Sequence, residues 1–491
     1  RLIIFDKNNI KFEYLIDLVY DSKNFQGLLS QYDSPDQNLS FIISNQNYFS
    51  SFLEANNFNV KFIESLFYDD YVSLNGLEIS GKAEINGKSI EEVNYLNFDF
   101  KLNGSIEYLT FSGNKKIEFS DNLLTGSFDN NKIDISSNFF INQSLLKIGF
   151  KKKLDDFPFF YLRIDKILVS NLLKIWPKNV GNSTYDWMTK NSKGEIENVN
   201  IEIKTKLQKG KFEIKDINGN FECKDVEIAY MESMPPVKNI YGQATIFKDK
   251  VIFHIKSGQS NNLNLQSGII SLYDLTTDYE KADISLDIIS QNIDVVRYLN
   301  LTTIEKKNYS KLEKISGNVD LNLNLQFPLL VDLKVEQINY SSTAMLSNGF
   351  LRDIYEDYSI VGLELDIEVN KDFINYSGSG EINKSPLKFD GKQKKVEDKF
   401  IDEIKGNLLY NGENILGFFP GIIDKISGVL DLDFIINSHD DDYKIEVIGN
   451  TENLTIISNF LGEPSDFSEG KIRLLVNPYN KNYSGFFDLK T

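Results

Sequence analysis

The segment that decides the fold is residues 315–327, which read ISGNVDLNLNLQF. From Val319 to Phe327 every second residue is apolar, and the four residues between them are Asp, Asn, Asn and Gln. Successive side chains of a β-strand point to opposite faces of a sheet. The alternation therefore predicts a strand with one apolar face and one solvated face.

The same alternation recurs along the chain, and its apolar positions are candidates for one continuous lining. Four runs show the pattern clearly. Their candidate lining residues are Val199, Ile201 and Ile203; Val319, Leu321, Leu323 and Leu325; Leu363, Leu365 and Ile367; and Leu430, Leu432 and Phe434.

A looser repeat of an apolar residue, a polar residue and a glycine precedes many strands. Its irregular spacing argues against a tight solenoid and favours an extended array of strands. The glycines of six such triplets are Gly81, Gly219, Gly242, Gly317, Gly406 and Gly428. Gly81, Asn86-Gly87 and Asn103-Gly104 also predict a meander with hairpin turns at these points.

Helix signals are scarce. The sequence predicts short helices at Tyr48–Leu53, Ser170–Trp176, Ser183 to just before Gly194, Ile293–Leu301 and Asn414–Phe419. So long a one-sided sheet must cover its apolar face with a second sheet, with its own curvature or with a ligand. The predicted fold class is mainly β, an elongated and twisted antiparallel meander that forms an open apolar groove with a few short helices.

Composition excludes several classes of function. The 491 residues carry a formal net charge of -18, which disfavours nucleic acid and broad adhesion to anionic membranes. One cysteine, Cys223, and two histidines leave no disulfide and no Cys- or His-based metal cluster, so no cofactor or metal is expected. No uninterrupted run of about 18 apolar residues is present.

Local candidates for chemistry have simpler explanations. The acidic run His439-Asp440-Asp441-Asp442 lacks the Gly and distal Glu of a loop-type calcium site, so it predicts a solvated hairpin tip. Cys223 lies on an alternating strand and is expected to be a small strand residue. No nucleophile or acid–base motif is found, so the chain is not expected to be an enzyme.

One stretch departs from plain alternation and carries a family signature. It contains Trp176-Pro177, a second tryptophan, the glycine that opens the next strand, and a Tyr–Met-Pro-Pro–Ile-x-Gly string. The motif residues are Trp176, Pro177, Trp187, Gly194, Tyr230, Met234, Pro235, Pro236 and Gly242. The two tryptophans are expected to form a local core, with a membrane-contact cap as the alternative. The Pro-Pro pair is expected to end a strand.

This stretch, roughly Phe157 to Leu275, resembles the central module of the YhdP-like branch of the AsmA-like proteins of the bacterial envelope. The resemblance divides the chain into an N-terminal β-groove segment (1–156), a YhdP-like module (157–295) and a C-terminal AsmA-like groove segment (296–491). Such proteins are usually tied to the inner membrane by one N-terminal helix. The chain starts at Arg1 without that helix, so we expect it to be a fragment of a longer protein.

The resemblance implies a periplasmic, non-catalytic bridge that carries phospholipid from the inner membrane, with the outer membrane as a second contact. The alternation independently favours an acyl chain as guest, since each buried methylene is worth about 0.8 kcal/mol. The alternative is a structural or adhesive envelope protein of stacked β-sandwiches without lipid cargo. That alternative predicts compact units with dry cores.

Overall fold

The computed structural model describes residues 2–490 with gaps. The residues outside the description are 6–10, 46–48, 61–71, 90–91, 111–112, 130–131, 142, 154–155, 175–181, 209–210, 231–233, 278, 302–308, 331–332, 356–357, 397–398, 415–423, 440–441, 458–464, 467–468 and 478–481.

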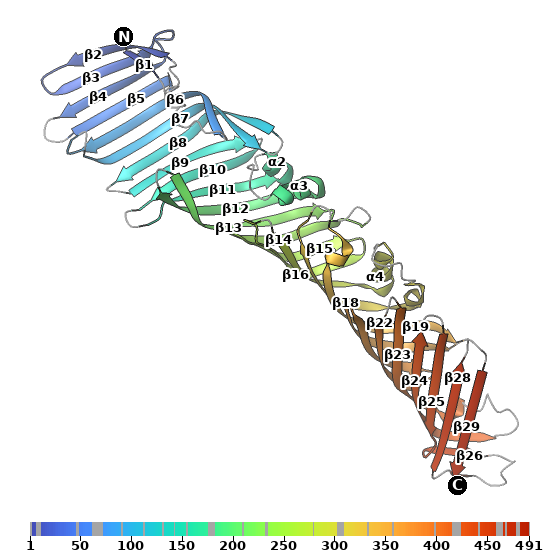
Figure 1. Ribbon diagram of the computed structural model, residues 1–491. Coiled ribbons are helices and arrows are strands. Elements are labelled where there is room, and N and C mark those ends of the chain that lie inside the picture. Colours follow the sequence, from blue (N-terminus) through green and yellow to red (C-terminus); the bar gives the residue numbers. More distant parts are fainter. Residues whose placement is uncertain are drawn as a thin grey trace.

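The chain forms one long antiparallel meander whose two ends lie at opposite tips of an elongated molecule (Figure 1). Each strand from β1 to β25 pairs with its neighbour in sequence, and β28 and β29 continue the sheet beyond β25. The start of β24 leaves this sheet and pairs with β26, which pairs with β27. The fold class predicted from the alternation is confirmed as a mainly β, elongated antiparallel sheet with few helices.

The elements have the following bounds. The strands before the first helix are β1 (Leu2–Phe5), β2 (Lys11–Tyr20), β3 (Asn24–Gln31), β4 (Asn38–Asn45), β5 (Phe49–Asn59), β6 (Val72–Gly87), β7 (Val93–Thr110), β8 (Gly113–Asp129), β9 (Lys132–Ile141), β10 (Ser144–Lys152) and β11 (Phe159–Leu168). The helices are α2 (Val169–Lys174), α3 (Asn182–Asn191) and α4 (Asn292–Leu299), with 3-10 turns η1 (Tyr309–Lys314) and η2 (Val335–Gln337).

The remaining strands complete the sheet. Between α3 and α4 lie β12 (Ser192–Gln208), β13 (Lys211–Ile228), β14 (Val237–Phe247), β15 (Val251–Ser260), β16 (Leu263–Tyr273) and β17 (Lys281–Gln291). After α4 come β18 (Ile315–Pro328), β19 (Asn339–Tyr355), β20 (Tyr358–Asn370), β21 (Phe373–Ile382), β22 (Ser385–Val396), β23 (Lys399–Asn411), β24 (Lys425–His439), β25 (Asp442–Asn450), β26 (Leu454–Ile457), β27 (Ser465–Asp466), β28 (Glu469–Asn477) and β29 (Asn482–Lys490).

The two long margins of the sheet differ. At one margin, β11 and β17 end and β12 and β18 begin, and α2, α3 and α4 lie along it (Figure 1). We call this the helix margin. The opposite margin, the hairpin margin, is made of short connections such as those between β12 and β13 and between β20 and β21. Buried clusters gather near the helix margin, where strands and helices pack together.

Strand pairing crosses both boundaries that the resemblance suggested. β10 pairs with β11 across residue 156, and β17 pairs with β18 across residue 295. The division into three segments stays a prediction.

The glycine repeat has a role other than the predicted hairpin turns. Gly81 lies inside β6 and Gly104 inside β7, and their φ angles are +149° and +148°. The register shifts beside Gly81 in the pairing of β5 with β6, and beside Gly104 in the pairing of β6 with β7. Gly317 and Gly428 also have positive φ, at +143° and +96°. A β-bulge bends a strand more sharply than regular pairing does, and glycine adopts the positive φ angles found there without strain. These glycines therefore bend strands instead of ending them.

Two local predictions are wrong. The sequence predicts a helix at Tyr48–Leu53, of which the structure describes residues 49–53, and these residues are the start of strand β5. Phe49 and Leu53 match a period of two as well as a period of four. Asn86-Gly87 is not a two-residue turn, since Gly87 pairs with Val93. The predicted helix Asn414–Phe419 lies outside the described residues except for Asn414.

We predict that Gly81→Ala weakens the local pairing of β6 and β7. A Cβ at Gly81 would lie 2.1 Å from the Asp99 carbonyl oxygen, and the φ of +149° strains any L side chain. The expected loss is about 1–3 kcal/mol, read as faster amide hydrogen exchange in both strands. Gly362→Ala is the control, because Gly362 has a positive φ of +58° but open space around its Cβ position. Equal increases in hydrogen exchange in the two variants would contradict the conclusion that the Asp99 carbonyl oxygen is too close to the Gly81 position for a side chain.

Candidate functional site: a continuous apolar face

The register places the candidate lining residues on one face of the sheet. Residues directly opposite each other in an antiparallel pair share a face. One row of such partners runs through the seventeen strands from β2 to β18. Its members are Ile16, Leu29, Leu39, Ala55, Gly81, Phe100, Leu124, Ser137, Ile148, Leu162, Ile201, Gly219, Ile246, Val251, Leu272, Ala282 and Phe327.

A second row carries the same face toward the C-terminus. It contains Val319, Leu346, Leu365, Gly378, Phe389, Gly406 and Phe434. Val319 and Phe327 are an even number of residues apart on β18, so they point to the same face of the sheet. The two rows therefore belong to one surface, which we call the apolar face. All thirteen candidates lie on it, either in these rows or an even number of residues away on the same strand. Their contact with lipid stays a prediction.

Burial divides the thirteen residues into two groups. The first residue of each run is buried, and these are Val199, Val319, Leu363 and Leu430. The later residues of every run are only half-buried. The buried ones lie nearest the helix margin, so protein already covers that strip. The strip toward the hairpin margin keeps apolar surface open.

The cover at the helix margin is local. Val169 and Leu173 of α2 and Tyr185 of α3 pack in one cluster with Ile164 and Val199 of the sheet. Farther along, Val295 of α4 packs against the cluster that contains Val319 and Leu363. Ile426 and Leu454 cover Leu430 where β24 turns to pair with β26. We call the half-buried strip of the apolar face the floor, and the buried clusters with their covering helices at the helix margin the wall.

The family motif joins the connection before β14 to α4. The hydroxyl groups of Tyr230 and Tyr298 form a hydrogen bond across 68 residues of sequence. Ser260 Oγ donates to the Pro235 carbonyl oxygen at 3.1 Å and lies 3.1 Å from Tyr298 Oη. Burial, and then the hydrogen bond with Tyr298, raises the pKa of Tyr230 far above its ordinary value. Sequence reading found Tyr230 and Pro235 but missed Tyr298, which has no distinguishing local pattern.

The other motif residues have structural roles. Gly194 has a φ of +119° at a register shift of β12, and a Cβ there would lie 2.7 Å from the Asp225 carbonyl oxygen. A Cβ at Gly242 would lie 2.6 Å from the His254 carbonyl oxygen. Met234 is buried. Pro235 and Pro236 directly precede β14, so they lie at the start of a strand, whereas the sequence predicts that they end one.

The predicted core role of Trp187 is wrong. Trp187 is 41% exposed, whereas Tyr185 and Met188 of the same helix pack against the sheet. Residues one and two apart on a helix do not share a face, so Tyr185 and Met188 turn Trp187 outward. Trp176 and Pro177 lie outside the described residues.

Aromatic rings lie flat over glycines on the apolar face. A Cβ at Gly406 would lie 2.3 Å from Phe434 Cζ, and one at Gly126 would lie 2.1 Å from Phe98 Cζ. Gly391 lies under the Tyr376 ring in the same way. Because glycine has no Cβ, each ring packs directly against the backbone of the neighbouring strand. The rings therefore protrude less from the apolar face. Gly406 was visible in the sequence repeat, but its partner ring was not.

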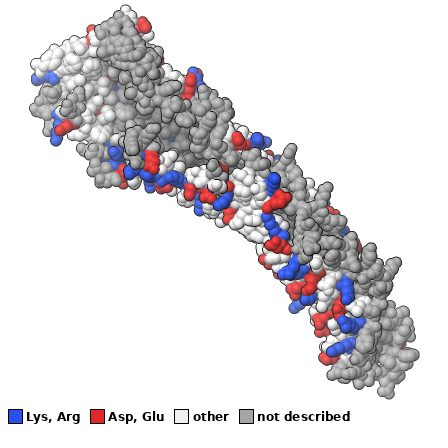
Figure 2. All heavy atoms as spheres, in the orientation of Figure 1, with Lys and Arg blue, Asp and Glu red and all other residues white. Residues whose placement is uncertain are grey.

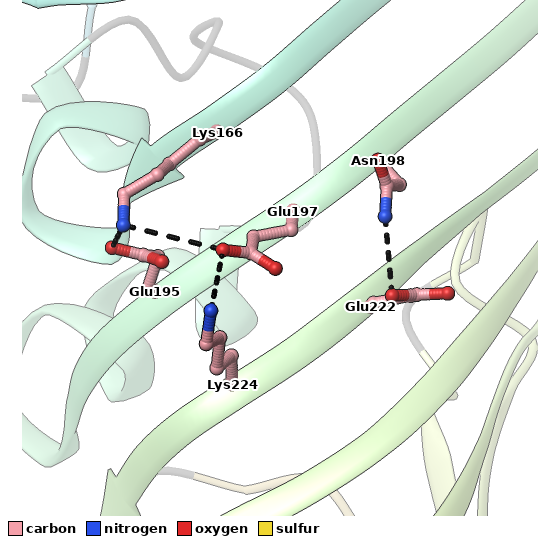
Figure 3. Close-up of polar contacts among 6 residues, drawn as sticks. All are labelled: Lys166, Glu195, Glu197, Asn198, Glu222 and Lys224. Carbon is pink, nitrogen blue, oxygen red and sulfur yellow. Dashed lines mark hydrogen bonds and ion pairs between the residues drawn. The ribbon is translucent and has the colours of Figure 1, made fainter.

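The opposite face, which we call the polar face, carries ion pairs (Figure 3). It also carries exposed apolar side chains, among them Ile269, Met345 and Ile401. Lys166 pairs with Glu195 and lies 4.0 Å from Glu197, and Lys224 Nζ lies 3.0 Å from Glu197 Oε1. The hydrogen bond from Lys166 lowers the pKa of the Glu195 carboxyl. Charged side chains of both signs also line the lower-left border of the molecule in Figure 2, over its middle and C-terminal parts.

A shallow hollow of about 690 Å³ lies over β18 to β22 on the polar face. Its lining includes the carboxylates of Asp320, Asp366, Glu368 and Asp390. In the described part of the chain, no group of three or more His, Cys, Asp or Glu side chains is placed to hold a metal ion. The hollow therefore has charge without the geometry of a cation site.

Cys223 lies on β13 opposite Ile196 and Gly242, and it packs against a buried cluster. Burial raises the pKa of its thiol to about 11. The thiol is thus protonated at neutral pH and lacks the thiolate that nucleophilic chemistry needs. The prediction that Cys223 is a small strand residue is confirmed.

We predict that Tyr298→Phe loosens the motif. The substitution removes the hydroxyl that Tyr230 and Ser260 contact. The expected local loss is about 1 kcal/mol, measured as faster hydrogen exchange at residues 228–237 and in α4. Tyr279→Phe is the control, because Tyr279 is 78% exposed. Unchanged hydrogen exchange in Tyr298→Phe would show that the hydrogen bonds of the Tyr298 hydroxyl do not hold this connection.

A comparison with known protein families finds a match that covers most of the chain. The family model described as YhdP protein matches residues 53–485 of the chain, far beyond the stretch that carries the sequence signature. No curated protein and no solved structure matches the chain.

None of the described helices is both long enough and apolar enough to cross a membrane.

Proposed function

The chain belongs to the YhdP protein family, and from that premise we propose that its apolar face carries phospholipids through the bacterial envelope. In this proposal the protein works in the periplasm and is non-catalytic. It is associated with the inner membrane, and it reaches toward the outer membrane. The single observation that carries the proposal is the apolar face, which extends over most of the described strands.

The continuity of this face supports movement of acyl chains along it. Each methylene that leaves water gains about 0.8 kcal/mol, so a whole acyl chain needs on the order of 10 kcal/mol of apolar contact. Half-buried floor residues such as Ile201, Leu323 and Leu432 offer such contact from one strand to the next. A guest that exchanges one apolar neighbour for another moves with little change in free energy.

The asymmetry of the two margins supports an orientation for the guest. The helix margin is already filled by buried clusters, so acyl chains would lie on the strip toward the hairpin margin. Head groups would then extend past that margin into water, beside the charged polar face. No covalent step is required of the protein.

The alternative is a structural or adhesive protein whose apolar faces close on each other. It requires a second sheet over the floor. In the described chain, Leu321, Leu323 and Leu325 remain half-buried, and the β24–β26–β27 corner covers only the neighbourhood of Leu430. This half-exposure favours a carried guest over a dry sandwich.

We predict that a photo-crosslinking amino acid at position 323 captures phospholipid in bacterial cells. Leu323 lies on the floor, and its neighbour Asn322 lies on the polar face of the same strand and donates to Asp287. The same probe at position 322 is therefore the matched control. Lipid adducts at 323 and none at 322 are the expected result, read by mass spectrometry. Equal labelling at both positions, or none at 323, would count against the proposal.

A further inference from the structure

Three neighbouring rows of the apolar face in β18 to β24 contain one charged residue. Two further rows lie beside the row of Val319 on this face. They consist of Leu321, Ala344, Ile367, Tyr376, Gly391, Ile404 and Ile436, and of Leu323, Ser342, Val369, Ile374, Gln393, Asp402 and Ser438. Within these three rows, all in described strands, Asp402 is the only charged residue. It lies in the row nearest the hairpin margin.

The Asp402 carboxylate is only partly satisfied. Ser438 Oγ donates to Asp402 Oδ2 at 3.4 Å. Asp402 Oδ1 is buried and has no hydrogen-bond partner. A carboxylate held among apolar groups is costly unless an opposite charge or donors complete it. Its neighbours in the same row, Gln393 and Ser438, are polar but uncharged.

One aromatic ring, that of Tyr376, lies in the row beside the row of Asp402. The Tyr376 ring lies over Gly391, two residues from Gln393, and its centroid is 6.4 Å from that of Phe389. Burial, and then the charge of Asp402, raises the pKa of Tyr376 to about 12. The Phe434 ring lies over Gly406 on the next pair of strands.

A carboxylate beside aromatic faces suits an organic ammonium ion. The face of an aromatic ring carries negative electrostatic potential and attracts cations. An ammonium also donates strong, charge-assisted hydrogen bonds to a carboxylate oxygen. Phosphate or an uncharged sugar would gain neither interaction, and phosphate would be repelled by Asp402.

We propose that Asp402, with Tyr376, is a resting site for lipids whose head group carries an ammonium. The proposal rests on the proposed function, because a lipid lying on the floor would place its head group at the hairpin margin, where Asp402 lies. Lipids with an ammonium head group would pause on β21 to β24, whereas anionic lipids without an amine would not.

The test compares head groups at constant acyl chains. The whole chain is incubated with vesicles of equimolar phosphatidylethanolamine and phosphatidylglycerol, isolated, and its bound lipids are counted by mass spectrometry. We expect the wild type to enrich the ethanolamine lipid. Asp402→Asn should lower the ratio of the two lipids about threefold to tenfold. Tyr376→Leu should lower it about twofold.

The control removes the same charge from the other face. Asp366 is exposed on the polar face of β20, so Asp366→Asn should leave the ratio unchanged. Bound lipid with the same ratio in the wild type and in Asp402→Asn would overturn the inference while leaving lipid carriage intact. A loss of both lipids together in Asp402→Asn would make the residue structural and would also overturn it.

Two further outcomes separate the possible sources of failure. Absence of any bound lipid in the wild type would reject the proposed function and the inference with it. Glycerophosphoethanolamine, which has the head group without acyl chains, is the second probe. Binding of this soluble compound as tightly as the lipid would assign the site to soluble amines and overturn its role in lipid carriage.

Discussion

Antiparallel register is the constraint on which the rest of this structure depends. Side chains alternate with a period of two, so a slip of one residue at any strand would move every later apolar residue to the wrong face. The row from Ile16 to Phe327 passes through strands with several bulges and still keeps its face. The register shifts beside Gly81 and Gly317 lie between β5 and β6 and between β18 and β19, and both glycines have a positive φ.

The floor and the wall follow from that constraint. A face that stays apolar over so many strands has to be covered, and the chain covers only its helix margin. Helices α2, α3 and α4 bury the first residue of several runs, while rings lying over Gly126, Gly391 and Gly406 keep the remainder flat. A strip of half-buried apolar surface remains along the hairpin margin. This strip suits an acyl chain because it is long and continuous. An acyl chain can lie along it without a closed pocket.

The sequence allowed the strands and the shared face to be predicted, because alternation is a local property of the chain. It did not allow the roles of the glycines to be separated. Gly81 and Gly406 belong to the same triplet repeat, yet one bends a strand and the other lies under the Phe434 ring, and only the neighbouring strand decides between them. Phe49 and Leu53 fit a helix and a strand equally well, so β5 was misassigned. Asp402 and Tyr298 owe their importance to partners far away in sequence, which no single-strand pattern contains.

The central claim is that the apolar face is a continuous surface occupied by lipid. Native mass spectrometry of the chain, produced in bacteria and purified without detergent, tests it most directly. The account predicts more than one bound phospholipid per molecule, because a surface that spans many strands has room for several acyl chains. A lipid-free protein with a compact scattering profile would contradict it and would favour closed β-sandwiches.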